Sequence, residues 1–399
     1  MSNSQWQYSR RALAMKSNII RETLKVTKRP GVISFGGGLP APELFPAEAL
    51  KEVCIKVLTE RPGEALQYAT TEGYPPLREI ISGRMNKLGI PCTADEILIT
   101  GGSQQGLDMV GRVFLDSASV IITSRPTYLG AIQAFNAYNV HYVTLPSDED
   151  GMTVYRLEEL IQTHGPRIIY LVPTFQNPDG RTIPVKRRKV ILELAEKYNI
   201  PIVEDDPYSE LPFDGDVPTH MKTLLPEQVI LLGTFSKLLA PGLRIAWIIA
   251  PKGDCYDRFV RMKQGADLHT NTFAQHIVYE FLKRDGLDTH LKTIKEVYSK
   301  RRNVMVEMMR KHFPEGVSFT EPNGGLFLWV TLPEGINTTE LLPKAVDKEV
   351  AYIPGSAFYP DGGGHNTMRL NYSKPTEEEI EIGIKRLGEL FAEALEVGK

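Results

Sequence analysis

Short apolar runs alternate with longer amphipathic stretches from about residue 50 onward. The runs are rich in Ile and Val, are bounded by Gly, Pro, Asp or Ser, and lie at 96–100, 119–123, 167–172, 200–205, 229–234 and 243–251. This composition is typical of strands that are buried on both faces. The stretches between them have helical periodicity. Such alternation predicts a mostly parallel sheet with right-handed crossovers, whose ligands bind at the carboxyl ends of the strands.

The pattern changes after about residue 285. A long charged helix is predicted over 288–312, followed by short strands, a short helix and a final helix over 377–395. Strands with few crossovers and flanking helices indicate a smaller α+β domain. The first 45 residues contain a predicted helix over about 9–27 and a Gly/Pro-rich segment at 36–46. The sequence leaves open which domain this segment contacts.

Composition and charge exclude several classes of protein. Lys and Arg total 46 against 49 Asp and Glu, so a net charge of −3 gives no general attraction to nucleic acid or to an anionic membrane. No apolar run approaches the length of a membrane span, and the N-terminus has no continuous apolar region of a secretory signal. The three scattered cysteines, Cys54, Cys92 and Cys255, form no disulfide framework, which favours a cytoplasmic location.

Two strand ends carry residues with candidate chemistry: one can bind an anion, and the other carries a candidate nucleophile. The sequence GGSQQG at 101–106 leads into a helix, where backbone N–H groups, Ser103 and Gln104 can bind a phosphate. Taken alone, such a motif is more often a Gly-rich turn with a serine cap than a phosphate site. Lys237 follows a buried strand beside Ser236, and Arg244 lies seven positions on. A desolvated lysine is the usual Schiff-base nucleophile, although most lysines lie in exposed loops.

Three further strand ends carry an acid, an amide and an aromatic ring. The carboxylate of Asp205, which Tyr208 follows closely, can pair with a protonated ring nitrogen. The Asn177 amide can donate to a phenolic oxygen, and the Tyr128 ring can stack on the face of another ring. Each has a simpler interpretation as a cap, a turn or core packing. The five strand ends together match one cofactor, pyridoxal 5'-phosphate, which needs all of these groups.

The chain resembles the class I aminotransferases of pyridoxal phosphate fold type I over essentially its whole length. Within them it is similar to the 2-aminoadipate, kynurenine and aromatic aminotransferase branch. The segments that carry the resemblance, in order, are SNIIRETLK, ISFGGGLPAPELFP, ALQYATTEGYPPLRE, GSQQGLD, RPTY, QNPDGRTIP, EDDPYSEL, GTFSKLLAPGLR, GGLFLWV and MRLNYS. The combination is far more specific than any of its parts.

The resemblance implies an α/β architecture. A large cofactor-binding domain over 49–287 would hold a mostly parallel seven-stranded sheet between helices. A smaller α+β domain would be formed by the N-terminal segment 1–48 together with residues 288–399. The resemblance also implies a homodimer in which the two active sites are shared.

The resemblance assigns a role to each residue at the strand ends. Lys237 would form the Schiff base with the cofactor aldehyde, and Asp205 would pair with the ring nitrogen. Tyr208 and Asn177 would bind the ring hydroxyl oxygen, and Tyr128 would stack on the ring.

The phosphate and the partner subunit account for five more residues. Ser103, Gln104, Ser236 and Arg244 would hold the phosphate, and Tyr68 would reach the phosphate in the neighbouring subunit.

Four residues would contact the substrate. Arg369, with Asn177, would bind the α-carboxylate, Arg21 would recognise a distal carboxylate, and Gly38 would lie beside the substrate. One departure from the family pattern, Asp179 in place of a small or hydroxylated residue, adds negative charge that disfavours acidic substrates.

The function implied is ping-pong transfer of an amino group from an L-amino acid to 2-oxoglutarate. The preferred donor is expected to be 2-aminoadipate, with aromatic or aliphatic amino acids and glutamate as further candidates. A β-eliminating C–S lyase of the same fold type would share every cofactor residue. An aminotransferase-like effector domain of a transcriptional regulator is disfavoured because no winged helix precedes the pattern, which starts near Ser17. A nucleotide-binding Rossmann protein is disfavoured because GxGxxG is missing.

Overall fold

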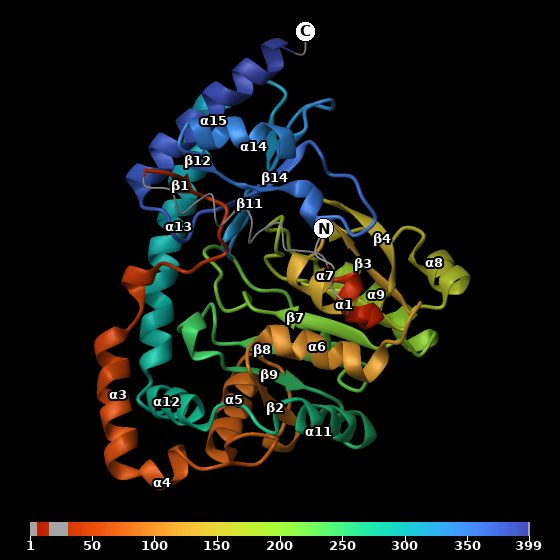
Figure 1. Cartoon of the computed structure of the whole chain (residues 1–399), viewed down its shortest axis with the longest axis vertical. Coiled ribbons are helices and arrows are strands. Elements are labelled where there is room, and N and C mark those ends of the chain that lie inside the picture. The colour runs from red at the N-terminus through yellow and green to blue at the C-terminus, as the bar shows by residue number, and fades with distance from the viewer. Residues whose placement is uncertain (1–5, 16–30, 398–399) are drawn as a thin grey trace.

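An eight-stranded sheet forms the centre of the molecule in the computed structural model, which describes residues 6–15 and 31–397 (Figure 1). In spatial order its strands are β2 (Ile97–Thr100), β9 (Ala246–Ile249), β8 (Val229–Thr234), β7 (Ile202–Asp206), β6 (Ile168–Leu171), β3 (Val120–Arg125), β4 (His141–Asp148) and β5 (Gly151–Met152). All six apolar runs singled out in the sequence are strands of this sheet. The prediction of buried strands is confirmed, because the residues of β2, β6, β8 and β9 are all buried.

The sheet is mostly parallel, as predicted. Strands β8, β7, β6, β3 and β4 pair in parallel, whereas β9 runs antiparallel to both β8 and β2. It follows that β2 runs in the same direction as β8, so the carboxyl ends of β2, β8, β7, β6 and β3 share one edge. The expected number of seven strands is wrong by one. Gly151, at φ +77°, turns the chain so that β5 pairs back on the end of β4 as an eighth strand.

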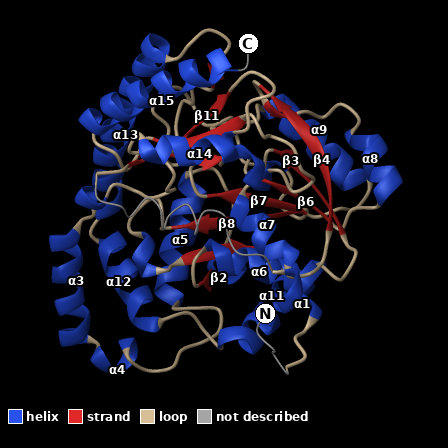
Figure 2. Cartoon of the chain, turned by 45° about the horizontal axis from the view of Figure 1, so that its top comes forward, coloured by secondary structure: helices blue, strands red, loops and turns tan. Residues whose placement is uncertain are grey.

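Helices cover the sheet on both sides (Figure 2). One group packs together from α6, α7 and α11, and another from α3, α5 and α12. The helices of this part of the chain are α3 (Ala47–Glu60), α4 (Pro62–Ala65), α5 (Pro75–Lys87), α6 (Ser103–Phe114), α7 (Leu129–Asn136), α8 (Leu157–His164), α9 (Val185–Lys197), α10 (Met221–Leu224), α11 (Asp254–Asp267) and α12 (Thr272–Lys283).

A second, antiparallel sheet is built by the C-terminal part of the chain. Its order is β10 (Ser318–Phe319), β11 (Phe327–Thr331), β14 (Thr367–Asn371) and β13 (Ile353–Pro354). The predicted long helix is confirmed as α13 (Gly286–His312), which runs along one side of the molecule from α12 to the final helix α15 (Glu377–Val397) (Figure 1). The short helix of this region is α14 (Thr338–Asp347).

The N-terminal segment contacts the C-terminal part of the chain. Strand β1 (Ile33–Ser34) pairs in parallel with β12 (Val350–Ala351), and the backbone N–H of Asn371 donates to the Phe35 carbonyl. The predicted helix over 9–27 is wrong as a continuous element. Helix α1 (Arg10–Ala14) starts at the Ser9 cap and ends before Met15, whose backbone is extended. The division into domains at 48 and 287 stays a prediction. In the part of the chain that the structure describes, no helix is long and apolar enough to cross a bilayer.

Candidate active site

Lys237 lies just beyond the buried end of β8. Its Nζ donates to the backbone carbonyl of Gly38 at 2.7 Å, so a segment 199 residues away in the chain holds the amine. The side chain keeps some exposed surface, but its amine is surrounded by protein. Burial, together with the positive charges of Arg369 and Arg244, lowers the pKa of Lys237 to about 8. A substantial fraction of neutral amine is therefore present near pH 8.

Asp205 is the last residue but one of β7, at the same edge of the sheet, and its two carboxylate oxygens have different environments. Oδ2 accepts a hydrogen bond from the Tyr170 hydroxyl at 2.7 Å, whereas Oδ1 is buried and has no hydrogen-bond partner among the described residues. Burial raises the pKa of Asp205 to about 7. The Tyr170 hydrogen bond opposes this shift, and the nearby Asp206 carboxylate adds to it. A buried carboxylate oxygen without a partner is costly, and a cationic N–H would satisfy it.

Groups suited to an anion lie together where β2, β8 and β9 meet. Gly102, at φ +89°, precedes the first turn of α6, and the buried Oγ of Ser103 has no partner among the described residues. A side-chain carbon added to Gly102 would lie 2.0 Å from the Arg244 guanidinium, which donates to the Gly101 carbonyl at 3.2 Å. Ser236 faces the same space. The glycine thus lets the arginine approach the free N–H groups at the start of the helix.

These groups line one cavity of about 190 Å³. Its walls come from five strand ends and consist of Ser103, Gln104, Tyr128, Val172, Asn177, Asp205, Pro207, Tyr208, Thr234, Ser236, Lys237, Pro241 and Arg244. Burial raises the pKa of Tyr128 to about 12, and it raises that of Tyr208 above its usual range, so both phenols remain protonated donors. Gln104 donates to the Gly130 carbonyl at 2.9 Å, which connects the start of α6 to α7.

Arg369 adjoins the cavity from β14. The residue is 1% exposed, and its guanidinium donates to Asn177 Oδ1 at 2.8 Å and to the Gly36 carbonyl at 2.7 Å. The ring of Phe327 lies 4.3 Å from the guanidinium carbon. Burial lowers the pKa of Arg369 to about 10, so the group stays cationic at neutral pH, and its buried Nε has no partner among the described residues. Gly38 lies alongside, because an added Cβ would be 3.9 Å from Arg369 Nη2.

Tyr68, one of the residues singled out in the sequence, does not line this cavity. Tyr68 is 79% exposed, and its ring packs edge-on to that of His269 instead of lining the site. Arg21 lies outside the described residues, and so does most of the predicted 9–27 helix.

Tyr170, the one side chain among the described residues that bonds to Asp205, is not among the residues expected from the sequence. It lies within the apolar run of β6 and was interpreted with that run as strand core. A buried tyrosine normally needs a partner for its hydroxyl, and that requirement was the available signal.

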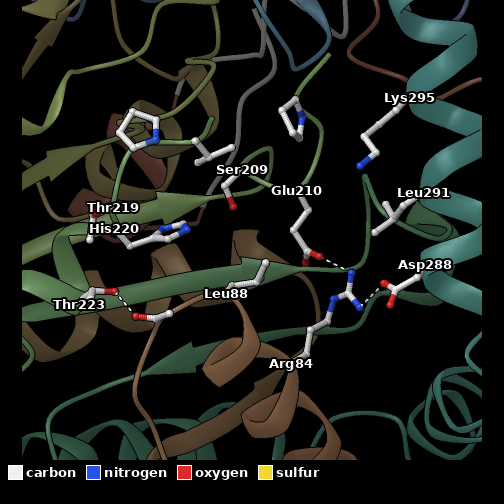
Figure 3. A pocket seen from close by; sticks show the side chains of 14 residues that line it. Arg84, Leu88, Ser209, Glu210, Thr219, His220, Thr223, Asp288, Leu291 and Lys295 are labelled. Carbon is white, nitrogen blue, oxygen red and sulfur yellow. Dashed lines mark hydrogen bonds and ion pairs between the residues drawn. The ribbon is translucent and has the colours of Figure 1, made fainter. Parts of the chain in front are cut away.

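A larger cavity of about 560 Å³ lies elsewhere, between α5, α13 and the chain after β7 (Figure 3). Its arginine is largely paired: Arg84 donates to Glu210 and, at 2.7 Å, to Asp288, and only its Nε has no partner among the described residues. His220 lies between two carboxylates of β7, with Nδ1 3.4 Å from Glu204 Oε1. Because its charges are largely paired internally, this cavity is a poorer candidate for chemistry than the smaller one.

The smaller cavity fits a flat phosphorylated pyridinium. The partnerless Oδ1 of Asp205 suits a ring N–H, and the partnerless Oγ of Ser103, with Arg244, suits a phosphate. The lysine amine lies where it can meet an aldehyde. A buried arginine beside them suits a carboxylate on a second molecule. No group of three or more His, Cys, Asp or Glu residues in the described ranges could hold a metal ion.

Comparison with known proteins agrees with this chemistry. The family model Aminotransferase class I and II matches residues 32–387. The chain is 46% identical to aromatic-amino-acid aminotransferase 1 of Thermococcus litoralis, over 97% of this chain and 94% of that protein. It is 42% identical to the 2-aminoadipate transaminase of Thermus thermophilus, over 94% of each. The crystal structure of Pyrococcus horikoshii kynurenine aminotransferase, in complex with PMP, has a TM-score of 0.93 and 43% identity, over 97% of each chain.

Proposed function

The chain belongs to the aminotransferase class I and II family and is a pyridoxal 5'-phosphate-dependent transaminase, and we propose that it takes amino groups from 2-aminoadipate and from aromatic and aliphatic amino acids. The proposed acceptor is 2-oxoglutarate. The observation that carries the proposal is the meeting, at one cavity, of the Lys237 amine and the partnerless Asp205 Oδ1, with the buried Arg369 bonded to Asn177 of the cavity wall.

Lys237 is proposed to move the proton. The cofactor, when bound, supplies an aldehyde for the substrate amine and a ring that accepts the electrons of the Cα–H bond. A lysine whose pKa is near 8 can take a proton near neutral pH and return it elsewhere. The Gly38 carbonyl, 2.7 Å from Nζ, would hold the free amine in a fixed position between these transfers.

Asp205 is proposed to keep the ring nitrogen protonated. An ionised carboxylate stabilises an adjacent pyridinium by charge pairing and a charge-assisted hydrogen bond, and Asp205 is buried, where such a pair is stronger than in water. Tyr208 and Asn177 would donate to the ring oxygen, and Tyr128 would cover the ring face. All four residues line the cavity, which supports these roles.

Arg369 is proposed to bind the α-carboxylate of every substrate. Its guanidinium can offer two parallel donors, and Asn177 and the Gly36 carbonyl fix the plane in which they lie. The Phe327 ring excludes water from one face of this group. A charge-assisted pair formed in such a setting is stronger than one formed in water.

Arg21 is proposed to select dicarboxylic donors. The experiment is a panel of 2-aminoadipate, kynurenine, phenylalanine, leucine and glutamate, each with 2-oxoglutarate. Arg21→Ala is expected to cost about 2 kcal/mol, about 30-fold in kcat/KM, for 2-aminoadipate but little for leucine, because only the former has a distal carboxylate. Lys25→Ala, a charge removal in the same segment, is the matched control. Equal losses for both donors in Arg21→Ala contradict the assignment.

The panel also separates transamination from β-elimination. A transaminase forms one 2-oxo acid for each 2-oxoglutarate that is aminated. A C–S lyase instead releases pyruvate and ammonia from a sulfur-containing substrate and needs no oxo-acid acceptor. Release of ammonia without amination of 2-oxoglutarate overturns the proposal.

A homodimer with shared active sites is proposed from Tyr68. This side chain points to solvent instead of into its own cavity, as expected for a group that serves the partner subunit. Chains carrying Tyr68→Ala and chains carrying Lys237→Ala should each have little activity. Mixing them should restore activity, because a mixed dimer then contains one intact site. No recovery on mixing refutes shared sites.

The three free cysteines support the proposal of a cytoplasmic location, because a reducing compartment keeps thiols unpaired.

A further inference from the structure

The Asp205 carboxylate has one bonded and one free oxygen. Oδ2 receives the Tyr170 hydroxyl at 2.7 Å, and Oδ1 is buried without a partner among the described residues. A carboxylate can rotate about its Cβ–Cγ bond, so its direction is set by what its oxygens contact. In this protein the contact comes from a tyrosine that does not line the cofactor cavity.

The sheet itself brings Tyr170 to Asp205. In the parallel pairing of β6 with β7, Tyr170 lies opposite Val203. Because side chains alternate along a strand, Val203 and Asp205 face the same side, and paired residues share that side. Tyr170 therefore faces Asp205 from the diagonal position, a separation that a long aromatic side chain can span.

The surroundings of Tyr170 hold its hydroxyl as a fixed donor. The residue is 1% exposed, and the Phe135 ring of α7 packs edge-on against it at 5.6 Å between centroids. Burial and the nearby Asp205 raise the pKa of Tyr170 well above its usual range. The hydroxyl thus keeps its proton at every working pH and can only donate to Asp205.

We propose that Tyr170 is a positioning residue, whose hydroxyl keeps Asp205 ionised and directs Oδ1 at the ring nitrogen of the cofactor. This inference rests on the proposed function, because it needs a pyridinium in the cavity. A hydrogen bond to the charged form of an acid favours that form. With Tyr170 present, the proton shared by Asp205 and the ring stays on the ring nitrogen, which is the form that accepts electrons from the Cα–H bond.

Other groups around Asp205 do not replace Tyr170. Asp206, the next residue of β7, raises the pKa of Asp205, and the phenols of Tyr128, just before α7, and of Tyr208, just after β7, lie near it. Neither of these phenols has a hydrogen bond to Asp205 in the structure. Tyr170 is the group that opposes the effect of burial.

The test removes one oxygen atom with Tyr170→Phe in the holoenzyme. The proton is expected to shift toward Asp205, so the ¹⁵N resonance of cofactor labelled at the ring nitrogen moves toward the unprotonated position. Cofactor binding, measured by titration of the purified apoenzyme, is expected to weaken about tenfold, which equals about 1.4 kcal/mol. An unchanged resonance and an unchanged affinity overturn the proposal.

The matched control is Tyr352→Phe. Tyr352 is also fully buried, and its hydroxyl also makes one 2.7 Å bond, but to the Thr338 backbone carbonyl away from the cavity. Any loss of stability common to both variants is structural, whereas the resonance should move only in Tyr170→Phe. In an Asp205→Asn background Tyr170→Phe should have little further effect on cofactor affinity. A full tenfold loss in that background shows that Tyr170 acts otherwise, and overturns the proposal.

A second variant tests the same proposal if Tyr170→Phe does not fold. A fluorinated tyrosine inserted at position 170 has nearly the same shape but is a stronger donor. It should move the resonance toward the fully protonated position, and no movement overturns the proposal. Failure of the wild type to bind the cofactor would count against the proposed function. Normal binding by the wild type, with no change of resonance or affinity on substitution of Tyr170, counts against this inference alone.

Discussion

Replacing Arg369 with lysine keeps the charge but removes the planar pair of donors. Arg369 is buried, and its guanidinium donates to Asn177 Oδ1 at 2.8 Å and to the Gly36 carbonyl at 2.7 Å. A lysine ammonium is a point donor that cannot hold both acceptors and also present two parallel N–H groups to a carboxylate. Loss of one charge-assisted hydrogen bond costs about 1.5–3 kcal/mol, which is about 10- to 150-fold in rate.

We therefore expect Arg369→Lys to lower kcat/KM about 100-fold, and by the same factor for 2-aminoadipate and for leucine, because both carry an α-carboxylate. The assay is initial-rate transamination of 2-oxoglutarate with each donor. The control is Arg301→Lys, since Arg301 is also buried but bonds the Ser373 carbonyl and Glu43 outside the cavity. That control is expected to lose stability without losing kcat/KM. A loss below threefold in Arg369→Lys, or a loss confined to 2-aminoadipate, refutes the reasoning.

Two further outcomes follow from the geometry of the cavity. The folded-state pKa of Asp205, about 7, lies above its unfolded value of about 4, so ionised Asp205 destabilises the apoenzyme increasingly as pH rises from 4 to 7. Asp205→Asn should accordingly raise the free energy of unfolding of the apoenzyme by up to ~4 kcal/mol at pH 8 but not at pH 4, as measured by denaturant unfolding. An equal difference between variant and wild type at both pH values contradicts this. Gly102→Ala should weaken cofactor binding at least tenfold, because its Cβ would lie 2.0 Å from the Arg244 guanidinium at φ +89°. Gly101→Ala, whose nearest contact would be Gln105 Oε1 at 3.4 Å, should bind nearly normally, and equal losses in the two variants count against the anion site.

The sequence predicted most of what local pattern determines. Buried strands have a distinctive composition, and in a parallel sheet their carboxyl ends meet at one edge, so Lys237, Asp205 and Tyr128 could be expected in one place before any coordinates. The structure places all three in the 190 Å³ cavity. The strand β5 was missed because a two-residue pairing after a glycine turn has no periodicity of its own.

Contacts between distant segments could not be predicted in this way. The bond from Arg369 to the Gly36 carbonyl joins residues 333 apart, and the bond from Lys237 to Gly38 joins residues 199 apart. Neither has a local signal, because each depends on how the N-terminal segment packs on β14 and β8. Tyr170 was hidden for another reason: an apolar run indicates a strand but not which of its side chains reaches an acid on the next strand.

The central claim is that Lys237 carries the cofactor, and borohydride reduction tests it most directly. The purified holoenzyme is reduced, digested and analysed by mass spectrometry. The account predicts one phosphopyridoxyl group per chain, attached to Lys237, and none after the same treatment of Lys237→Ala. Attachment to another lysine, or no attachment in protein saturated with pyridoxal phosphate, contradicts it.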